Sequence, residues 1–469
     1  MPENSWPEND SYSELESISS LVSDLSSEDL DSTSYPGFEG RRRKAAVTLT
    51  IVWGGTVALH LFSWGYWLVL GLTTLMGIHA LRVLLARPLA TPEPLSDENQ
   101  EEWPFVSLLV AAKNEEAVIG QLVKALCRLD YPACRYDLWV IDDSSTDRTP
   151  LVLKQLAQEY DQLNVFYRSA EAGGGKSGAL NQVLPLTQGE IIAVFDADAQ
   201  VPRDLLQRVL PLFARSEVGA VQVRKAIANA NTNFWTKGQM SEMALDAFFQ
   251  QQRIAMGGVG ELRGNGQFVR RAALERCGGW NEETITDDLD LTLRLHLDQW
   301  DIDFLNFPAV EEEGVTHSLA LWHQRNRWAE GGYQRYLDYW RLIVRNRLGT
   351  RKTIDLLMFW MTQYVLPTAA VPDFVMAIAR NRPPMLAPVT SLTVILSLIG
   401  MFLGLRHVQK RSFLVTLLQT LRGTFYMFHW LLVIASTTAR ISVRPKRLKW
   451  VKTRHQGHDE VWLDVPEQP

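Results

Sequence analysis

The stretch Ile191-Ile192-Ala193-Val194-Phe195-Asp196-Ala197-Asp198 decides the fold that we expect for this chain. Its first five residues are apolar, and most are β-branched or aromatic, which predicts a strand buried on both faces. The strand ends on two carboxylates, and open α/β sheets bind ligands beyond the carboxyl ends of their strands. Asp196 and Asp198 are therefore candidate ligands of a Mg²⁺ or Mn²⁺ ion that bridges a diphosphate. The alternative is a loop that caps the next helix.

The segment 103–223 alternates between expected strands and expected helices. The expected strands are Phe105–Ala112, Leu138–Ile141, Val165–Tyr167 and Ile191–Phe195, with a helix from about Ala117 to Leu129. This alternation is typical of a doubly wound, mostly parallel sheet. The carboxyl ends of its strands meet at one edge, where we expect the functional site.

A second acidic run, Asp142-Asp143-Ser144-Ser145-Thr146-Asp147, follows the second expected strand. Thr146 and Asp147 precede Pro150 and suit the start of a helix. Asp142 and Asp143 can accept hydrogen bonds from a base or a ribose. The glycine-rich loop at 173–178 contains one cation, Lys176, but lacks the spacing of a nucleotide-binding P-loop.

Six motifs in order give the chain a family resemblance. They are Lys113-Asn114-Glu115-Glu116, the acidic run 142–147, Gly175-Lys176-Ser177-Gly178-Ala179-Leu180-Asn181, Asp196-Ala197-Asp198, Thr286-Asp287-Asp288-Leu289-Asp290-Leu291 and Gln324-Arg325-Asn326-Arg327-Trp328. Together they resemble the inverting glycosyltransferases of family 2, which have the GT-A fold. The resemblance covers roughly 215 residues, and the order of the motifs makes it far more specific than any one motif.

The resemblance implies a role for each matching position. Asp142 and Asp143 would contact uridine, and Lys176 and Asp196 would bind the nucleotide sugar. Asp198, with Asp196, would hold the metal, and Asp288 would be the general base. Gln324, Arg327 and Trp328 would bind the diphosphate and frame the acceptor entrance. The motif has Asp287 where the family has Glu, and we expect Asp287 and Asp290 to be capping or surface acids.

An inverting transfer needs one base and no second catalytic carboxylate. An α-linked donor would therefore give a β-linked product.

Between the two halves of the resemblance, Gly257–Gly260 and Gly264–Phe268 predict a glycine-dense loop. Close approach of the backbone to a sugar or an acceptor is one interpretation, and plain turn formation is the other. The resemblance favours acceptor positioning.

No Asp, Glu, Lys or Arg occurs from Ala45 to Leu81. This length suits two membrane crossings of roughly 18 residues each with a turn near Ser63-Trp64-Gly65. Basic residues flank both ends, at 41–44 and at Arg82 and Arg87, so the positive-inside rule places both flanks, and the domain that follows, in the cytoplasm. The three cysteines, Cys127, Cys134 and Cys277, show no metal-ligand spacing and suit a reducing compartment.

The chain after Trp328 is also expected to meet the membrane. Tyr333, Tyr336, Leu337 and Trp340 recur at helical spacing, which predicts an amphipathic helix in the headgroup plane or, alternatively, a helix packed on the soluble domain. Hydrophobic runs follow at 354–378, 386–405 and 413–438. Prolines at 367 and 372 and the pair Arg422-Gly423 predict breaks, half-helices and two to four crossings. Arg422 is a candidate headgroup or acceptor contact, and the alternative is that it marks a loop.

The 469 residues thus divide into six expected parts. They are a disordered acidic tail at 1–40, a transmembrane hairpin at 41–88, a cytoplasmic catalytic domain at 100–332, an interfacial helix at 333–350, a transmembrane region at 353–440 and a basic cytoplasmic tail at 441–469. The net charge of −6 says little about partners, because the acidic tail supplies most of the excess of Asp and Glu, but the lack of a basic stripe predicts no nucleic-acid partner. The sequence leaves any protein partner open.

The whole chain is similar to the cyanobacterial β-monoglucosyldiacylglycerol synthases. This resemblance implies UDP-glucose as donor, the 3-hydroxyl of 1,2-diacylglycerol in the membrane as acceptor, and Mg²⁺, with Mn²⁺ as the alternative metal. It also implies an integral protein of the plasma membrane, the thylakoid membrane or both. The rival interpretations are a processive polysaccharide synthase of the cellulose or hyaluronan type, and a scaffold without activity.

Overall fold

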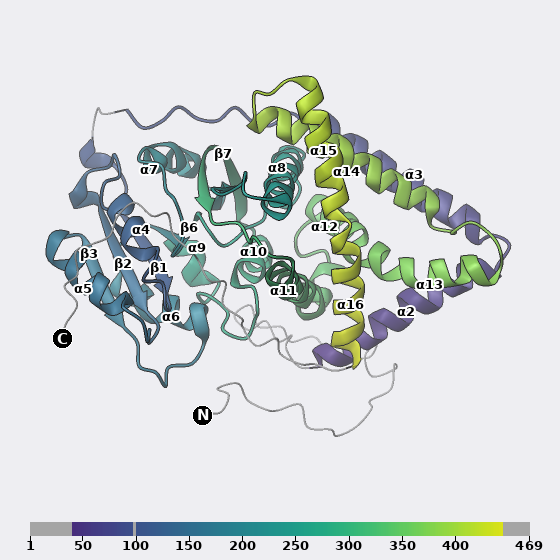
Figure 1. Cartoon of the computed structure of the whole chain (residues 1–469), viewed down its shortest axis with the longest axis horizontal. Coiled ribbons are helices and arrows are strands. Elements are labelled where there is room, and N and C mark those ends of the chain that lie inside the picture. Colours follow the sequence, from purple (N-terminus) through teal and green to yellow (C-terminus); the bar gives the residue numbers. More distant parts are fainter. Residues whose placement is uncertain (1–39, 97–99, 444–469) are drawn as a thin grey trace.

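The computed structural model describes residues 40–96 and 100–443. The acidic tail expected at 1–40 and the basic tail expected after 440 therefore lie almost wholly outside the described residues. The expected catalytic domain, which we call the catalytic part, occupies one side of the molecule in Figure 1. Long helices project from it on the other side.

One seven-stranded sheet, in the order β3-β2-β1-β4-β6-β5-β7, forms the centre of the catalytic part. Its strands are β1 (Val106–Ala112), β2 (Tyr136–Asp142), β3 (Leu163–Tyr167), β4 (Ile191–Asp196), β5 (Val218–Ile227), β6 (Gln267–Arg270) and β7 (Asp301–Glu312). Only β6 runs antiparallel to its neighbours β4 and β5. The expected doubly wound, mostly parallel sheet is confirmed, and its first four strands are the four that the sequence predicts.

The register of the central strands brings the acidic strand ends together. Ala111 of β1 pairs with Asp196 of β4, and Ala112 pairs with Asp142 of β2. The three strands are parallel, so their carboxyl ends lie level at one edge of the sheet. The residues that follow them, including Asp143 and Asp198, are held at that edge by apolar strands that are almost entirely buried.

Helices cover both faces of the sheet (Figure 1). One face is packed by α4 (Ile119–Leu126), α5 (Thr149–Glu159) and α7 (Leu205–Val209). The other is packed by α6 (Gly175–Val183), α9 (Arg271–Arg276) and α10 (Asp287–Leu297). Short 3₁₀ turns, η2 (Gln100–Glu102), η3 (Ala133–Arg135), η4 (Leu184–Leu186) and η5 (Leu210–Ala214), complete this part. Because apolar side chains pack on both faces of the sheet, the carboxyl edge of its strands is held rigidly.

Two long helices join the catalytic part to the projecting helices. They are α8 (Phe234–Ala255) and α11 (Ser318–Val344). The segment expected to begin an interfacial helix at 333 is the continuation of α11, and every residue from Ala329 to Tyr339 is buried inside the molecule. Even the charged Arg335 and Asp338 of this stretch are 3% and 7% exposed.

Four of the described helices are long and apolar enough to cross a membrane: Arg41–Leu61 (α2), Gly65–Leu85 (α3), Thr350–Ala379 and Ala387–Val408 (α14). At about 1.5 Å per residue, 21 residues span about 31 Å, close to the ~30 Å hydrocarbon core of a bilayer. Large apolar side chains point outward from α3, including Trp67, which is 72% exposed, and Ile78, which is 56% exposed. These helices make the chain a membrane protein.

The helices after 350 differ from the breaks that the sequence predicts. Residues 350–379 form one continuous helix made of α12 (Thr350–Trp360), a π-helical turn η6 (Met361–Val365) and α13 (Leu366–Ala379), so Pro367 and Pro372 do not divide it into half-helices. The helix α15 (Phe413–Met427) runs through Arg422-Gly423 and ends just before α16 (His429–Val443). A helical Gly423 fits there because a side chain would meet Met401 and Ser241.

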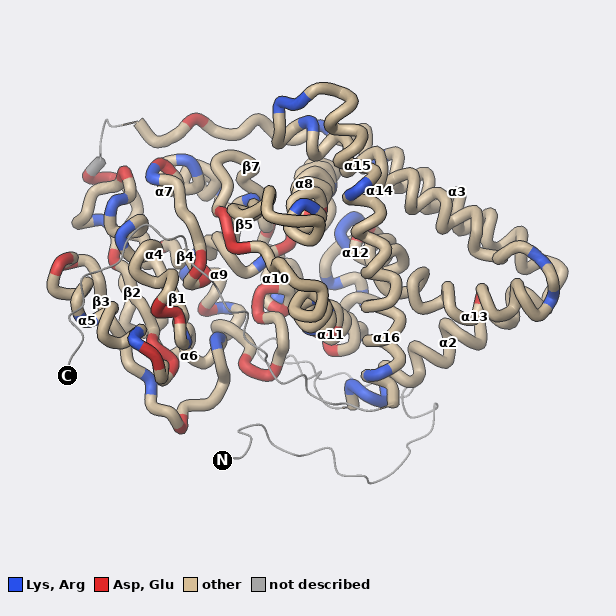
Figure 2. Tube along the Cα trace, in the orientation of Figure 1, with Lys and Arg blue, Asp and Glu red and all other residues tan. Residues whose placement is uncertain are grey.

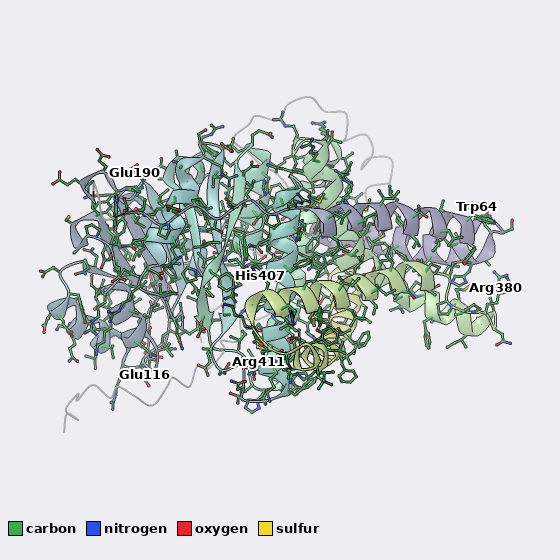
Figure 3. The ribbon with its side chains drawn as sticks, turned by 90° about the horizontal axis from the view of Figure 1, so that it is seen from above. Trp64, Glu116, Glu190, Arg380, His407 and Arg411 are labelled. Atoms are coloured by element: carbon green, nitrogen blue, oxygen red, sulfur yellow. The ribbon has the colours of Figure 1, made fainter. Side chains whose placement is uncertain are left out.

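The projecting helices form a bundle with a far end and a near end. Figure 3 shows Trp64, in the turn between α2 and α3, and Arg380, at the end of α13, together at the far end, opposite Glu116 and Glu190 of the catalytic part. Lys and Arg gather near the catalytic part, at 41–44, 351–352 and 406–411, whereas the far end carries Arg380 and Arg382 (Figure 2).

Candidate active site

A cavity of about 2290 Å³ opens at the carboxyl edge of the sheet. Eight of the nine residues that the sequence predicts for the site line it: Asp143, Lys176, Asp196, Asp198, Asp288, Gln324, Arg327 and Trp328. We call this part of the cavity the donor lobe. The cavity continues between α3, η6, α13 and α14, and we call that part, lined by residues such as Met76, Gln363 and Thr393, the membrane lobe.

Asp142 is the predicted site residue that does not line the cavity. It is the last residue of β2 and is 3% exposed. Successive side chains of an extended chain point to opposite faces, so Asp142 turns into the protein while Asp143 turns toward the cavity. Asp143 accepts hydrogen bonds from Lys113 Nζ at 3.3 Å and from the buried Arg168 guanidinium. Asp143 alone of this pair lines the cavity.

Lys176 and Asp196 form an ion pair across the donor lobe. Lys176, at the start of α6, donates to Asp196 Oδ1 at 2.6 Å. Burial opposes the charge on Lys176, but the carboxylates of Asp196 and Asp287 outweigh it and hold its pKa above the usual value. Burial likewise opposes the charge on Asp196, and Lys176 and Lys225 reverse the effect and lower its pKa. Both groups are charged at neutral pH.

Asp198 lies two residues beyond the end of β4 and faces the same lobe. Its Oδ2 accepts the backbone N–H of Glu313 at 3.0 Å, which fixes the carboxylate at the end of β7. No group of three or more His, Cys, Asp or Glu side chains within 40–96 and 100–443 could enclose a metal ion. Two aspartates fit a Mg²⁺ or Mn²⁺ ion that takes its remaining oxygens from phosphate and water. The donor set therefore fits a metal that arrives with a diphosphate.

Asp288 lies in the first turn of α10 and lines the cavity. Its Oδ1 accepts the backbone N–H of Leu289 at 2.8 Å. Burial and then the like charge of Asp287 raise the pKa of Asp288 to about 6. A carboxylate with a pKa near the working pH is suited to take a proton from a hydroxyl group. Gly264, of the predicted glycine loop, approaches so closely that a Cβ there would lie 3.4 Å from Asp288 Oδ2.

The raised pKa predicts how activity depends on pH. A protonated Asp288 cannot accept a proton, so kcat/KM should fall about tenfold per pH unit below pH 6 and level off above it. Replacing Asp287 by Asn removes the neighbouring negative charge, and the acid limb of the profile should then move to lower pH. Rate measurements from pH 4.5 to 8 on both proteins test this. An acid limb that the Asp287→Asn change leaves in place would contradict the coupling.

Asp290, the third acid of this motif, has a structural role. It is 2% exposed, its Oδ2 accepts from Arg294 at 2.7 Å, and its Oδ1 accepts the hydroxyl of Tyr339 at 2.8 Å. It therefore joins α10 to α11, inside the protein rather than at the expected capping or surface position. Asp287 differs, because it lines the cavity beside Asp288.

The motif 324–328 divides its residues between the cavity and the interior. Gln324, Arg327 and Trp328 line the cavity, as predicted. Within the described ranges Arg327 has no ion-pair partner, so its guanidinium is available to a phosphate; burial lowers its pKa, and Asp196 and Asp288 oppose this. Arg325 is fully buried, pairs with Glu242 at 2.6 Å and stacks 4.1 Å from the ring centre of Trp328.

Two cavity residues were missed because their strands were not predicted. Lys225 of β5 lies 2.8 Å from Glu312 of β7, and its ammonium group lies 5.5 Å from the ring centre of Trp328. The strand β5 carries the charged pair Arg224-Lys225 near its end, which interrupts the apolar pattern of a buried strand, so the hydrophobic pattern did not predict it. Lys225 adds a further cation to the donor lobe, besides Lys176 and Arg327.

Comparisons with known proteins identify the family of this chain. The family model described as glycosyltransferase-like family 2 matches residues 104–331. A beta-monoglucosyldiacylglycerol synthase of Nostoc sp. is 66% identical over 472 residues, covering 98% of this chain and 100% of that protein. One of Synechocystis sp. is 54% identical over 478 residues, covering 100% of both chains.

A solved structure has the same fold. The mannosyltransferase PcManGT from Pyrobaculum calidifontis, in complex with GDP-Man and Mn²⁺, superposes with a TM-score of 0.54 at 20% identity and covers 86% of this chain and 99% of its own. By its full-length relatives and its matched catalytic part, the chain belongs to the family 2 glycosyltransferases, in the group of the beta-monoglucosyldiacylglycerol synthases.

Proposed function

We propose that this chain transfers one glucosyl residue from UDP-glucose to the 3-hydroxyl of 1,2-diacylglycerol, with inversion, and so makes beta-monoglucosyldiacylglycerol. The chain is 66% and 54% identical to the synthases of Nostoc sp. and Synechocystis sp. over almost its full length, so it shares their activity, beta-monoglucosyldiacylglycerol synthesis. One observation carries the detailed proposal: Asp288 lies in a single cavity with the nucleotide-side acids at one end and membrane helices at the other.

The donor lobe suits a nucleoside diphosphate sugar. Asp143, at the end of β2, would accept hydrogen bonds from the uracil or the ribose. Lys176, Lys225 and Arg327 would surround the two phosphates, and Trp328 would close the side toward the acceptor. Because these cations are fixed before the donor arrives, they can stabilise the charge that develops on the departing diphosphate.

The transfer follows from this placement. The 3-hydroxyl oxygen of the acceptor attacks the anomeric carbon from the side of Asp288, and Asp288 takes the hydroxyl proton. The new C–O bond forms as the bond from the anomeric carbon to the β-phosphate oxygen breaks, and UDP leaves with the bonding electrons. Attack opposite the leaving group turns the α-linked donor into a β-linked product.

Asp196 and Asp198 would hold Mg²⁺, or Mn²⁺, against the diphosphate. When bound, such an ion neutralises phosphate charge and so favours departure of UDP. The chain's own contribution is to fix the two carboxylates, Asp196 through Lys176 and Asp198 through the backbone of Glu313.

The catalytic part would lie on the cytoplasmic side of the membrane. Cations gather at the near end of the helix bundle, at 41–44, 351–352 and 406–411, and the far end carries Arg380 and Arg382 (Figure 2). Short flanks rich in Lys and Arg stay in the cytoplasm. The donor would therefore come from the cytoplasm, and the acceptor from the leaflet that faces it.

A labelling experiment tests the proposal. Membranes that contain the full chain are incubated with radiolabelled UDP-glucose and diacylglycerol, with Mg²⁺ or with a chelator, and the lipids are separated by thin-layer chromatography. We expect one lipid product with a single β-glucose that disappears with the chelator. Label that stays at the origin as a polymer would make the polysaccharide synthase the better interpretation, and a lipid product insensitive to chelation would contradict the metal site.

A further inference from the structure

The loop 281–286 leads directly into the first turn of α10, which carries Asp287 and Asp288. We call it the α10 loop. Its residues 283–286 line the cavity. The loop forms no helix or strand of its own, so contacts from neighbouring elements set its position. Whatever fixes this loop also fixes how Asp288 faces the cavity.

Side chains of the catalytic part hold the first half of the α10 loop. Asn181 of α6 donates to Glu282 Oε1 at 2.9 Å. Asn281 donates its amide N–H to Oδ1 of the buried Asp290 at 3.1 Å. The loop also packs closely on Gly174, because a Cβ there would lie 2.2 Å from Glu282 Oε2. This half of the loop therefore lies against the glycine-rich loop of the donor lobe.

The second half of the α10 loop rests on α11. The backbone N–H of Ile285 donates to Gln334 Oε1 at 3.3 Å. Thr286 packs against Gly331, where a Cβ would lie 2.3 Å from the Thr286 hydroxyl. Between the two halves, Glu283 is exposed, and its backbone carbonyl meets a side chain from a third element.

That third element is α2, the first membrane helix, which packs against α11 (Figure 1). Arg41, its first residue, divides its guanidinium between two partners. Nε and Nη2 donate to the carboxylate of Asp338 in α11 at 2.9 and 2.6 Å, and Nη1 donates to the carbonyl of Glu283 at 2.9 Å. Burial raises the pKa of Asp338, and the hydrogen bonds from Arg41 oppose the rise. The planar fork of a guanidinium can hold two acceptors in a fixed geometry.

We propose that Arg41 is a positioning residue for the transfer, because it ties the α10 loop to the membrane hairpin and so holds Asp288 in line for the acceptor hydroxyl. This rests on the function proposed above. Arg41 acts through the carbonyl of Glu283 rather than on the reacting atoms. Its effect is large because a misplacement of about 1 Å can lower a rate by about 10²-fold. The membrane hairpin thus contributes to catalysis as well as to anchoring.

Three variants separate positioning from stability. Arg41→Ala removes both contacts. Arg41→Lys keeps a cation beside Asp338, but an ammonium group lacks the fork that serves two acceptors. The double variant with Arg41→Met and Asp338→Leu removes both charges of the pair, and replacing a buried ion pair by apolar residues is often neutral for stability. Arg42→Ala is the matched control, since Arg42 is exposed and has no hydrogen bond or ion pair within the part of the chain that the structure describes.

The purified full-length proteins are assayed in mixed micelles with UDP-glucose and 1,2-dioleoylglycerol, and their thermal unfolding is followed in the same detergent. We expect kcat to fall about 10²-fold in Arg41→Ala and in the double variant, and Arg41→Lys to recover part of it. The KM for UDP-glucose should stay unchanged, because Lys176 and Arg327 remain in place. The double variant should melt near the wild-type temperature, whereas Arg41→Ala, which leaves Asp338 unpaired, should melt lower. Arg42→Ala should keep the wild-type kcat.

Hydrogen exchange measured by mass spectrometry follows the loop without any substrate. The backbone N–H groups of Glu283 and Ile285, which donate to Asn281 and Gln334, should exchange faster in Arg41→Ala and in the double variant but not in Arg42→Ala. A double variant with the wild-type kcat, or with unchanged exchange in this loop, overturns the positioning role. A wild type that makes no lipid product overturns the proposed function instead, and the exchange rates still show whether Arg41 holds the loop.

Discussion

Replacing Asp288 by Asn should lower kcat by about 10²- to 10⁴-fold, the usual contribution of a positioned general base. Asn has the same shape and cannot take the proton of the acceptor hydroxyl. Binding of UDP-glucose should change little, because Lys176, Asp196 and Arg327 remain in place. Single-turnover rates and donor binding by calorimetry, in detergent, separate the two effects.

A matched control lies at the other end of the same helix. Asp298 follows α10 directly and pairs with the exposed Arg276 at 2.8 Å, away from the cavity. Asp298→Asn should keep nearly full activity. If Asp288→Asn also kept activity within tenfold of the wild type, Asp288 would not be the base, and the adjacent Asp287, which lines the cavity, would be the next candidate.

Two arginines of one motif should respond in opposite ways. Arg327→Ala should lower kcat by about 10²- to 10³-fold, since it removes a fixed cation from the departing diphosphate. It should hardly change the melting temperature, because the guanidinium has no ion-pair partner within the described residues. Arg327→Lys should recover only part of the rate, since an ammonium group lacks the planar fork that binds two phosphate oxygens.

Arg325→Ala should instead destabilise the protein by about 3–5 kcal/mol, because it leaves Glu242, which is 12% exposed, without its counterion. The carboxylate of Glu242 also accepts from Tyr426 at 3.1 Å and from Trp430 at 2.8 Å, so the pair joins α8 and α11 to the last two helices. Thermal unfolding in detergent measures this loss. A stable Arg325→Ala protein, or an unstable Arg327→Ala protein, would contradict the division of roles.

Sequence patterns predicted the features that depend on local residue order. The apolar runs followed by acids located β1, β2 and β4 and the edge they share, because parallel strands bring their carboxyl ends together wherever the helices pack. The long run without charges located α2 and α3 and their turn, since the length of an apolar helix follows from bilayer thickness alone. The order of the motifs gave the family, which the full-length relatives confirm.

Contacts between distant segments decided the rest. Strands β5 and β7 carry Lys225 and Glu312, whose charges pair across the sheet, and no local pattern contains that information. The same reason explains α11. From the sequence alone, Arg335 would be expected to face solvent. In the structure it pairs in the interior with Glu261, 74 positions earlier, at 2.8 Å.

The sequence by itself therefore determined the sheet's acidic edge, the membrane hairpin and the family. The tertiary structure decided which acid of the pair Asp142 and Asp143 faces the cavity, how α11 is buried, and that Pro367 makes a π-turn instead of a break. The physical reason is the range of the forces involved. Hydrophobic periodicity and chain geometry act over a few residues, whereas the desolvation of a charged or amide group is offset only by a partner that folding brings from far along the chain.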